Sequence, residues 1–121
     1  MPMLFSPMFL KRTPAAVAVI ERAKRLPPEI GANLFPAMVR WDAAHVEAAL
    51  AAVRVPLLVI QTTTLNAERK RISLKSGDTT PWLDLVRSRV PQARIEVLPG
   101  LGHFAQIDAP EQVNALIGSL G

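Results

Sequence analysis

His103 is the residue of this sequence best placed to do chemistry. It stands in the stretch LPGLGHFAQ, where Pro99, Gly100 and Gly102 follow a segment, residues 94–98, that carries branched apolar side chains. That segment predicts a strand, and the glycines permit backbone angles that larger residues resist. His103 is therefore expected on a loop just beyond a strand end, and loops carried by a rigid scaffold are where reactive groups are usually found.

The element after His103 is predicted to be a helix. Asp108 offers an N-cap oxygen, Pro110 suits the first turn, and Glu111 lies three residues after Asp108, as the partner in a capping box would. The helix should run to about Leu120. His103 would then be held between a strand and a capped helix, with Phe104 as its apolar neighbour.

The other polar candidates are weaker. His45 lies in an alanine-rich segment without a partner pattern, and two isolated histidines without a cysteine do not make a zinc site, so we expect neither a metal nor a cofactor. The basic group Arg69, Lys70 and Arg71 is most simply a solvated loop. A second interpretation stays open, in which one of these arginines binds a carboxylate.

The composition limits the class of protein. The chain has 121 residues, half of them hydrophobic, with 11 prolines, no cysteine and a net charge of +4. This indicates one globular domain in a reducing compartment, with the cytoplasm as the default. The basic residues form no face interleaved with aromatics, which argues against nucleic-acid binding. No apolar run approaches the roughly 20 residues that span a bilayer, so no membrane association is expected.

Residues 1–53 read as a block of helices. Thr13 caps a helix that begins at Pro14 and ends near Leu26. A second helix is predicted from about Glu29 towards Arg40, disturbed at Pro36, and a third, capped by Asp42, over residues 43–53.

Residues 54–121 read as strand, loop, helix, strand, loop, helix. The unbroken apolar run at 57–60 predicts a strand covered on both faces, and a polar stretch over residues 62–80 predicts a long loop. A helix capped by Thr79 or Thr80 then begins at Pro81 and ends before Pro91. Two strands separated by a helix imply parallel pairing. Because a two-stranded sheet has open edges and a small core, the chain is expected to associate.

Two segments together resemble the C-terminal part of an α/β-hydrolase. They are VPLLVIQ at 55–61 and VPQARIEVLPGLGHFAQIDAPEQVNALI at 90–117, preceded by the helical block. The resemblance implies an α/β fold made of a lid-like helical segment (1–53) and a βαβα part of the hydrolase core (54–121). It also implies that His103 stands at the position of the catalytic general base.

The sequence departs from the family pattern at the nucleophile and at the acid. None of its five serines lies in the G-x-S-x-G motif that forms the family's nucleophile elbow. No carboxylate follows the strand at 57–60, where the acid is expected. Among the later candidates, Glu68, Asp78 and Asp84, we favour Asp78, because it lies beside Gly77 in a loop that can fold back. Asn66 is an alternative that could orient the imidazole as a neutral group.

Two functions therefore remain open. The first is a C-terminal portion of a serine hydrolase acting on small apolar esters, amides or carbon–carbon bonds, with the nucleophile on a segment outside this sequence. Substrate would contact Phe104, Phe9 and Met8, the last two from an apolar N-terminal cluster that also holds Met1, Met3 and Phe5. The second is an inactive truncated product that pairs with another copy of itself or with the missing N-terminal half. An in-frame G-x-S-x-G encoded upstream of Met1 would identify a fragment.

Overall fold

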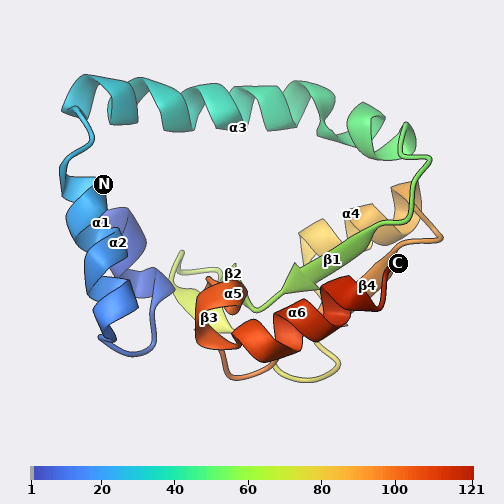
Figure 1. Cartoon of the computed structure of the whole chain (residues 1–121). Helices are drawn as coiled ribbons and strands as arrows, with labels where there is room; N and C mark the ends of the chain where they lie inside the picture. Colours follow the sequence, from blue (N-terminus) through green and yellow to red (C-terminus); the bar gives the residue numbers. More distant parts are fainter. Residues whose placement is uncertain (1) are drawn as a thin grey trace.

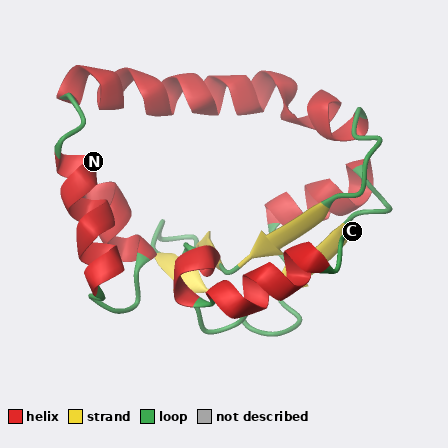
Figure 2. Cartoon of the chain, in the orientation of Figure 1, coloured by secondary structure: helices red, strands yellow, loops and turns green. Residues whose placement is uncertain are grey.

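The computed structural model describes residues 2–121, with side chains described from Leu4 onward, and it shows a mixed α/β chain (Figures 1 and 2). In chain order the elements are α1 (Pro2–Phe5), the 3₁₀ helix η1 (Ser6–Met8), α2 (Pro14–Lys24), α3 (Pro28–Ala51), β1 (Leu58–Gln61), β2 (Thr63–Leu65), β3 (Arg71–Ser73), α4 (Pro81–Arg89), β4 (Arg94–Val97), α5 (Ala105–Asp108) and α6 (Pro110–Gly118).

The predicted helix from Pro14 is confirmed as α2. Thr13 Oγ1 accepts a hydrogen bond from the Ala16 N–H at 3.2 Å, which satisfies one of the free donors of the first turn. Ala16 and Ile20, four residues apart on one face of the helix, are both buried. The helix ends at Lys24, two residues before the predicted end.

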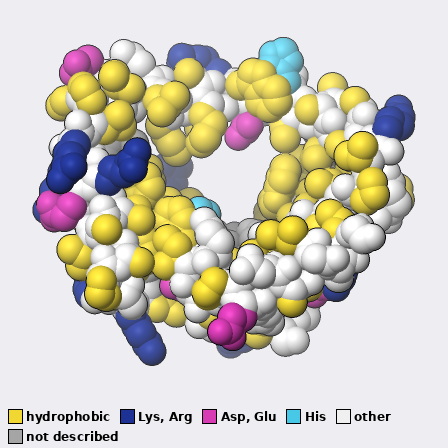
Figure 3. Space-filling view, in the orientation of Figure 1, with side chains coloured by type: hydrophobic (Ala, Val, Ile, Leu, Met, Phe, Trp, Pro, Cys, Tyr) yellow, Lys and Arg dark blue, Asp and Glu magenta, His cyan; other side chains and the backbone are white. Residues whose placement is uncertain are grey.

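The prediction of two helices over residues 29–53 is wrong, because α3 is one helix of 24 residues with Pro36 inside it and Asp42 within its length. Proline removes only one backbone bond, and the residues on both sides are good helix formers. The end of α3 that carries Val46 and Leu50 packs on α4. Figure 1 shows α3 crossing one side of an open ring, and Figure 3 shows an opening in the middle that side chains do not fill.

The two predicted parallel strands are confirmed as β1 and β4, which pair in register from Leu58 with Arg94 to Gln61 with Val97. Helix α4 connects them and begins as predicted, with the Thr80 hydroxyl accepting from the Leu83 N–H at 3.1 Å. The prediction that β1 is covered on both faces is wrong. All four of its residues are only partly buried, because β1 pairs with β4 alone in the described chain.

The prediction of a long loop over residues 62–80 is also wrong, since β2 and β3 form an antiparallel hairpin there. Asn66 organises the turn, its side-chain oxygen accepting from the N–H groups of Glu68 and Lys70, while Arg69 takes a left-handed φ of 59°. The described chain therefore has four strands rather than the two predicted.

The core consists of two clusters around the parallel pair. The first joins Leu50, Val86 and Val90 to Val59 and Ile95. The second joins Leu98, the residue after β4, to residues of α5 and α6, Ala105 and Val113 among them. The second cluster fixes the polypeptide on both sides of His103. Within residues 2–121 no helix is long and apolar enough to cross a membrane.

Candidate functional site around His103

Hydrogen bonds from several segments hold the backbone of the His103 loop, and three of them lie at Gly102 and His103. The His103 N–H donates to the Met8 carbonyl at 2.8 Å, so the loop is tied to the N-terminal segment. The buried Thr62 hydroxyl donates to the Gly102 carbonyl at 2.6 Å. The Gly102 N–H donates to Asp108 Oδ2 at 2.8 Å. The position of His103 is thus fixed by groups from three separate parts of the chain.

Gly102 is the residue that permits this close packing. A Cβ atom at this position would lie 2.6 Å from the Met8 carbonyl oxygen and 2.7 Å from Asp108 Oδ2, distances that real Cβ contacts do not show. Glycine is therefore required by the approach of the Met8 backbone rather than by a special backbone angle.

The predicted capping box at Asp108 is wrong. Asp108 ends the short helix α5, Ala109 precedes α6, and no side chain caps α6. The carboxylate of Asp108 instead accepts the Gly102 N–H, and Pro110 stands at the start of α6 as predicted. Asp108 therefore braces the His103 loop.

The imidazole of His103 contacts the hairpin. Its Nδ1 lies 3.2 Å from Arg71 Nη1 and 3.4 Å from the hydroxyl of Thr63, and Arg71 Nη1 also donates to that hydroxyl at 2.9 Å. A guanidinium has donors and no acceptor, so we assign Nδ1 as the acceptor of this contact. The neutral ring then carries its proton on Nε2, which faces away from Arg71.

The same arrangement lowers two pKa values. Burial lowers the pKa of His103, and the charge of Arg71 lowers it further. Burial also lowers the pKa of Arg71, although a guanidinium keeps its charge in proteins. At neutral pH the site therefore holds one cation, Arg71, and a neutral imidazole.

The apolar side of the site is a cluster of three phenylalanines, here called the aromatic cluster. Phe104 stacks on Phe5 at 6.3 Å, lies 5.2 Å from Phe9 and makes a T-shaped contact with the His103 ring at 5.1 Å, all between ring centroids. Met8, the neighbour of Phe9 in the sequence, is buried. The predicted substrate residues Met8, Phe9 and Phe104 are thus brought together with His103. Met1 lies outside the described residues, as does the side chain of Met3.

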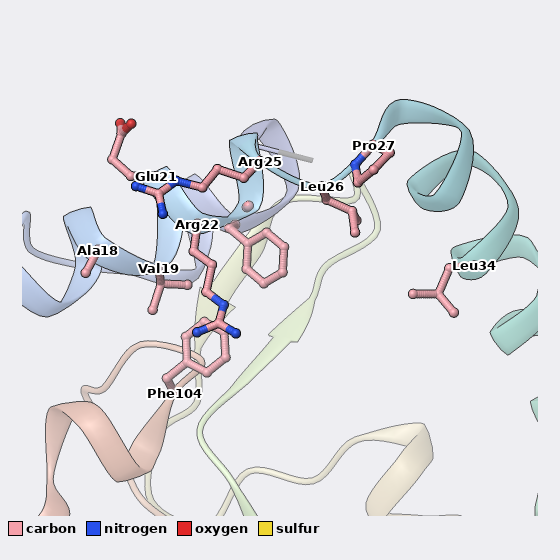
Figure 4. Close-up of a pocket in the computed structure, with 11 residues that line it drawn as sticks. Ala18, Val19, Glu21, Arg22, Arg25, Leu26, Pro27, Leu34 and Phe104 are labelled. Atoms are coloured by element: carbon pink, nitrogen blue, oxygen red, sulfur yellow. The ribbon is translucent and has the colours of Figure 1, made fainter.

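An open cleft of about 1020 Å³ borders the aromatic cluster (Figure 4). Its wall is mainly apolar and comes from α1, α2, the segment that joins α2 to α3, the start of α3 and the His103 loop. The residues that line it include Phe5, Val19, Arg22, Leu26, Leu34 and Phe104. Arg22 extends towards Phe104 in Figure 4. Arg25 and Glu21 also line the cleft, so its edge carries two cations and one carboxylate.

Asp78, the acid favoured from the sequence, is not brought to His103. Its carboxylate accepts the Lys75 N–H at 2.7 Å in a turn that Gly77 completes with a φ of +84°. Asp84 accepts from Thr79 and Arg87 on the outside of α4. In the described chain, the groups that contact the imidazole nitrogen are Arg71 and Thr63 instead.

The remaining candidates from the sequence, His45 and Asn66, make local contacts in α3 and in the hairpin turn. His45 is exposed on α3, where its ring meets Trp41 at 5.4 Å between centroids. Asn66 is used in the hairpin turn. Among the described residues, no three histidine, aspartate or glutamate side chains are grouped to hold a metal ion.

Arg71 and Thr63 are brought together beside His103 by the pairing of β2 with β3, which the sequence analysis did not predict. Thr63 pairs with Ser73 and Leu65 pairs with Arg71, so Thr63 and Arg71 are diagonal neighbours on one face. The signal in the sequence was two short runs with β-branched residues, at 62–65 and 71–73, separated by the turn former Asn66.

No protein-family model matches this chain, and neither does any curated protein or any solved structure. The class that the structure itself defines is a mixed α/β chain with a histidine loop at the end of a parallel strand.

Proposed function

We propose that this chain is the C-terminal portion of a serine hydrolase of the α/β-hydrolase type, acting on small apolar esters, amides or carbon–carbon bonds. The observation that carries the proposal is His103, held just beyond the carboxyl end of β4 and against the aromatic cluster. The parallel pairing of β1 with β4 through α4 supports it, as does the helical block that precedes β1. In this proposal residues 1–53 serve as a lid, residues 54–121 belong to the core, and the protein acts in the cytoplasm.

The reaction would need a serine from outside this sequence. His103 Nε2 would take the serine proton, and the imidazolium would later give it to the leaving group. For this, the neutral ring must carry its proton on Nδ1, where a carboxylate would accept it. In the described chain Arg71 occupies that side of the ring. Catalysis therefore requires Arg71 to move and Asp78, or another acid, to take its place.

We expect the isolated 121-residue chain to have no serine-hydrolase activity, because it lacks a G-x-S-x-G elbow and its imidazole is not poised as a base. The measurement is covalent labelling by a fluorophosphonate probe, followed by mass spectrometry of the five serine-containing peptides. Labelling at Ser6, Ser73, Ser76, Ser88 or Ser119 would contradict this expectation.

The hydrolase proposal itself is tested on the genomic DNA upstream of the Met1 codon and on any longer product that it encodes. An in-frame G-x-S-x-G whose serine reacts with the probe would support the proposal. His103→Ala should then slow labelling, and His45→Ala, on the exposed face of α3, should not. A longer product without a probe-reactive serine would overturn it.

A second candidate function, an association module without catalysis, is favoured by the surface of α3. Six of its apolar side chains are 47–59% exposed, a large amount for one helix, and Figure 3 shows apolar side chains around the central opening. The residues concerned are Ile30, Leu34, Phe35, Met38, Val39 and Trp41. In this candidate, a second copy of the chain or the missing N-terminal half covers α3.

For the isolated chain we expect a dimer or a larger form, because burying this surface is worth roughly 25 cal/mol per Å² of apolar area. Light scattering coupled to size exclusion measures the mass directly. A mass equal to the 13.2 kDa monomer at working concentration would contradict association. Leu34→Glu should shift the distribution towards monomer, whereas Asn33→Glu, also exposed on α3, should not.

A further inference from the structure

Arg71 carries a positive charge that no carboxylate of the described chain neutralises. The ion pairs among residues 4–121 are Lys24 with Glu21, Arg87 with Asp84, Arg89 with Glu47 and Arg94 with Glu96. Arg71 is nevertheless partly buried, and that burial lowers its pKa. A partly desolvated cation without a counter-charge is an unfavourable arrangement that an anion would relieve.

The guanidinium is held in place with donors to spare. Arg71 Nη1 is fixed by the Thr63 hydroxyl and by His103 Nδ1, and Thr63 is itself buried. The hydrogen bonds found for this side chain in the described structure all use Nη1, whereas a guanidinium has five N–H donors in a planar fork. The edge formed by Nε and Nη2 thus suits the two oxygens of a carboxylate.

The surface beside this cation is apolar. His103, in contact with Arg71, makes a T-shaped contact with Phe104. Phe104 in turn packs against Phe9 and lines the open cleft. Arg69 and Lys70 contribute exposed charges on the hairpin turn, but of the three basic residues it is Arg71 that contacts His103. A ligand that contacts both the Arg71 guanidinium and the apolar surface of Phe104 and Phe9 must have an anionic end and an apolar body.

We infer that Arg71 binds the carboxylate of a small apolar carboxylic acid whose body packs against Phe104 and Phe9. Thr63 and His103 orient the guanidinium. Phe104 contacts His103 on one side and lines the cleft on the other, so it connects the charged part of the site to the cleft. The inference goes beyond the proposed function, because binding requires neither a serine nor a change in the His103 tautomer. It holds equally for a chain that catalyses nothing.

The test is nuclear magnetic resonance on the unmodified 121-residue chain labelled with ¹⁵N, using phenylacetate as the probe. We expect saturable shifts of the Arg71 Nε and His103 ring resonances, with the neutral analogue phenylacetamide binding about tenfold more weakly because the charge-assisted hydrogen bonds are lost. Acetate and inorganic phosphate should also bind more weakly, since neither has an apolar body. Equal affinity for phenylacetate and phenylacetamide, or for phenylacetate and phosphate, would overturn the inference.

Two charge-matched variants locate the site. Arg71→Gln should weaken phenylacetate binding about tenfold, and Lys70→Gln, which removes the same charge from the same hairpin, should change it less than twofold. Equal losses in the two variants would mean a general electrostatic attraction and would refute a site at Arg71. If Arg71→Gln does not fold, the comparison of phenylacetate with phenylacetamide on the unmodified chain still shows whether the site prefers a carboxylate, and equal affinities refute the inference.

Discussion

Replacing Leu83 with alanine should lower the free energy of unfolding by about 2–5 kcal/mol, the usual range for a Leu→Ala change in a core. Leu83 is fully buried on α4, the helix that connects the two parallel strands. Its N–H is bonded to Thr80, whose hydroxyl in turn donates to Gln61 on β1 at 2.9 Å. A cavity at Leu83 would therefore weaken the packing of α4 beside the strand that leads to the hairpin.

The measurement is urea unfolding followed by circular dichroism at 222 nm. The matched control is Leu10→Ala, the same chemical change at a side chain that is 60% exposed, and we expect it to alter the unfolding free energy by less than about 0.5 kcal/mol. If the two variants lose similar amounts of stability, Leu83 is not in a close-packed core and the placement of α4 is wrong.

The features predicted correctly from the sequence are the ones that local chemistry determines. Thr13 and Thr80 cap the helices that begin at Pro14 and Pro81, as the pattern of a hydroxyl followed by proline indicates. The parallel pairing of β1 with β4 followed from the helix between them. In each case the deciding interactions lie within a few residues of one another or within one βαβ unit.

The features predicted wrongly depend on competition between local and distant partners. Asp108 had the spacing of a cap for the following helix, but it bonds the Gly102 N–H, a partner whose nearness only the folded loop creates. Asp42 has the residue type of a cap for a separate third helix, but it lies within α3, which continues through both Pro36 and Asp42. The hairpin is not evident in the sequence, because its strands are only three residues long, too short to show a period of two.

In the candidate site, too, the features set by local sequence could be predicted and those set by distant partners could not. The loop of His103 and its apolar neighbours Met8, Phe9 and Phe104 could be predicted, because glycines, strand and aromatics mark them in the sequence. The polar partner of His103 could not, since Asp78 and Arg71 are both loop residues by pattern and the hairpin decides between them. Of the three basic residues at 69–71, strand pairing selects the one that faces Thr63.

Replacing Gly102 with alanine should lower the free energy of unfolding by about 1–3 kcal/mol, the usual cost of overpacking. The new methyl group would lie 2.6 Å from the carbonyl oxygen of Met8, a backbone atom that cannot turn aside as a flexible side chain does. Relief requires the N-terminal segment to move away, which breaks the bond from the His103 N–H to Met8. Phe9 would then be drawn away from Phe104, so the aromatic cluster should separate with the loop.

Two measurements distinguish this local effect from general destabilisation. Hydrogen exchange at the His103 amide should accelerate more in Gly102→Ala than exchange at the Val90 amide, whose partner Val86 lies in the first core cluster. The matched control is Gly118→Ala, at the end of α6, where an added Cβ meets nothing within 4 Å and alanine favours the helix. Normal protection of His103 in Gly102→Ala would show that Met8 does not hold the loop. The aromatic cluster would then lack the backbone support that both the hydrolase proposal and the carboxylate site require.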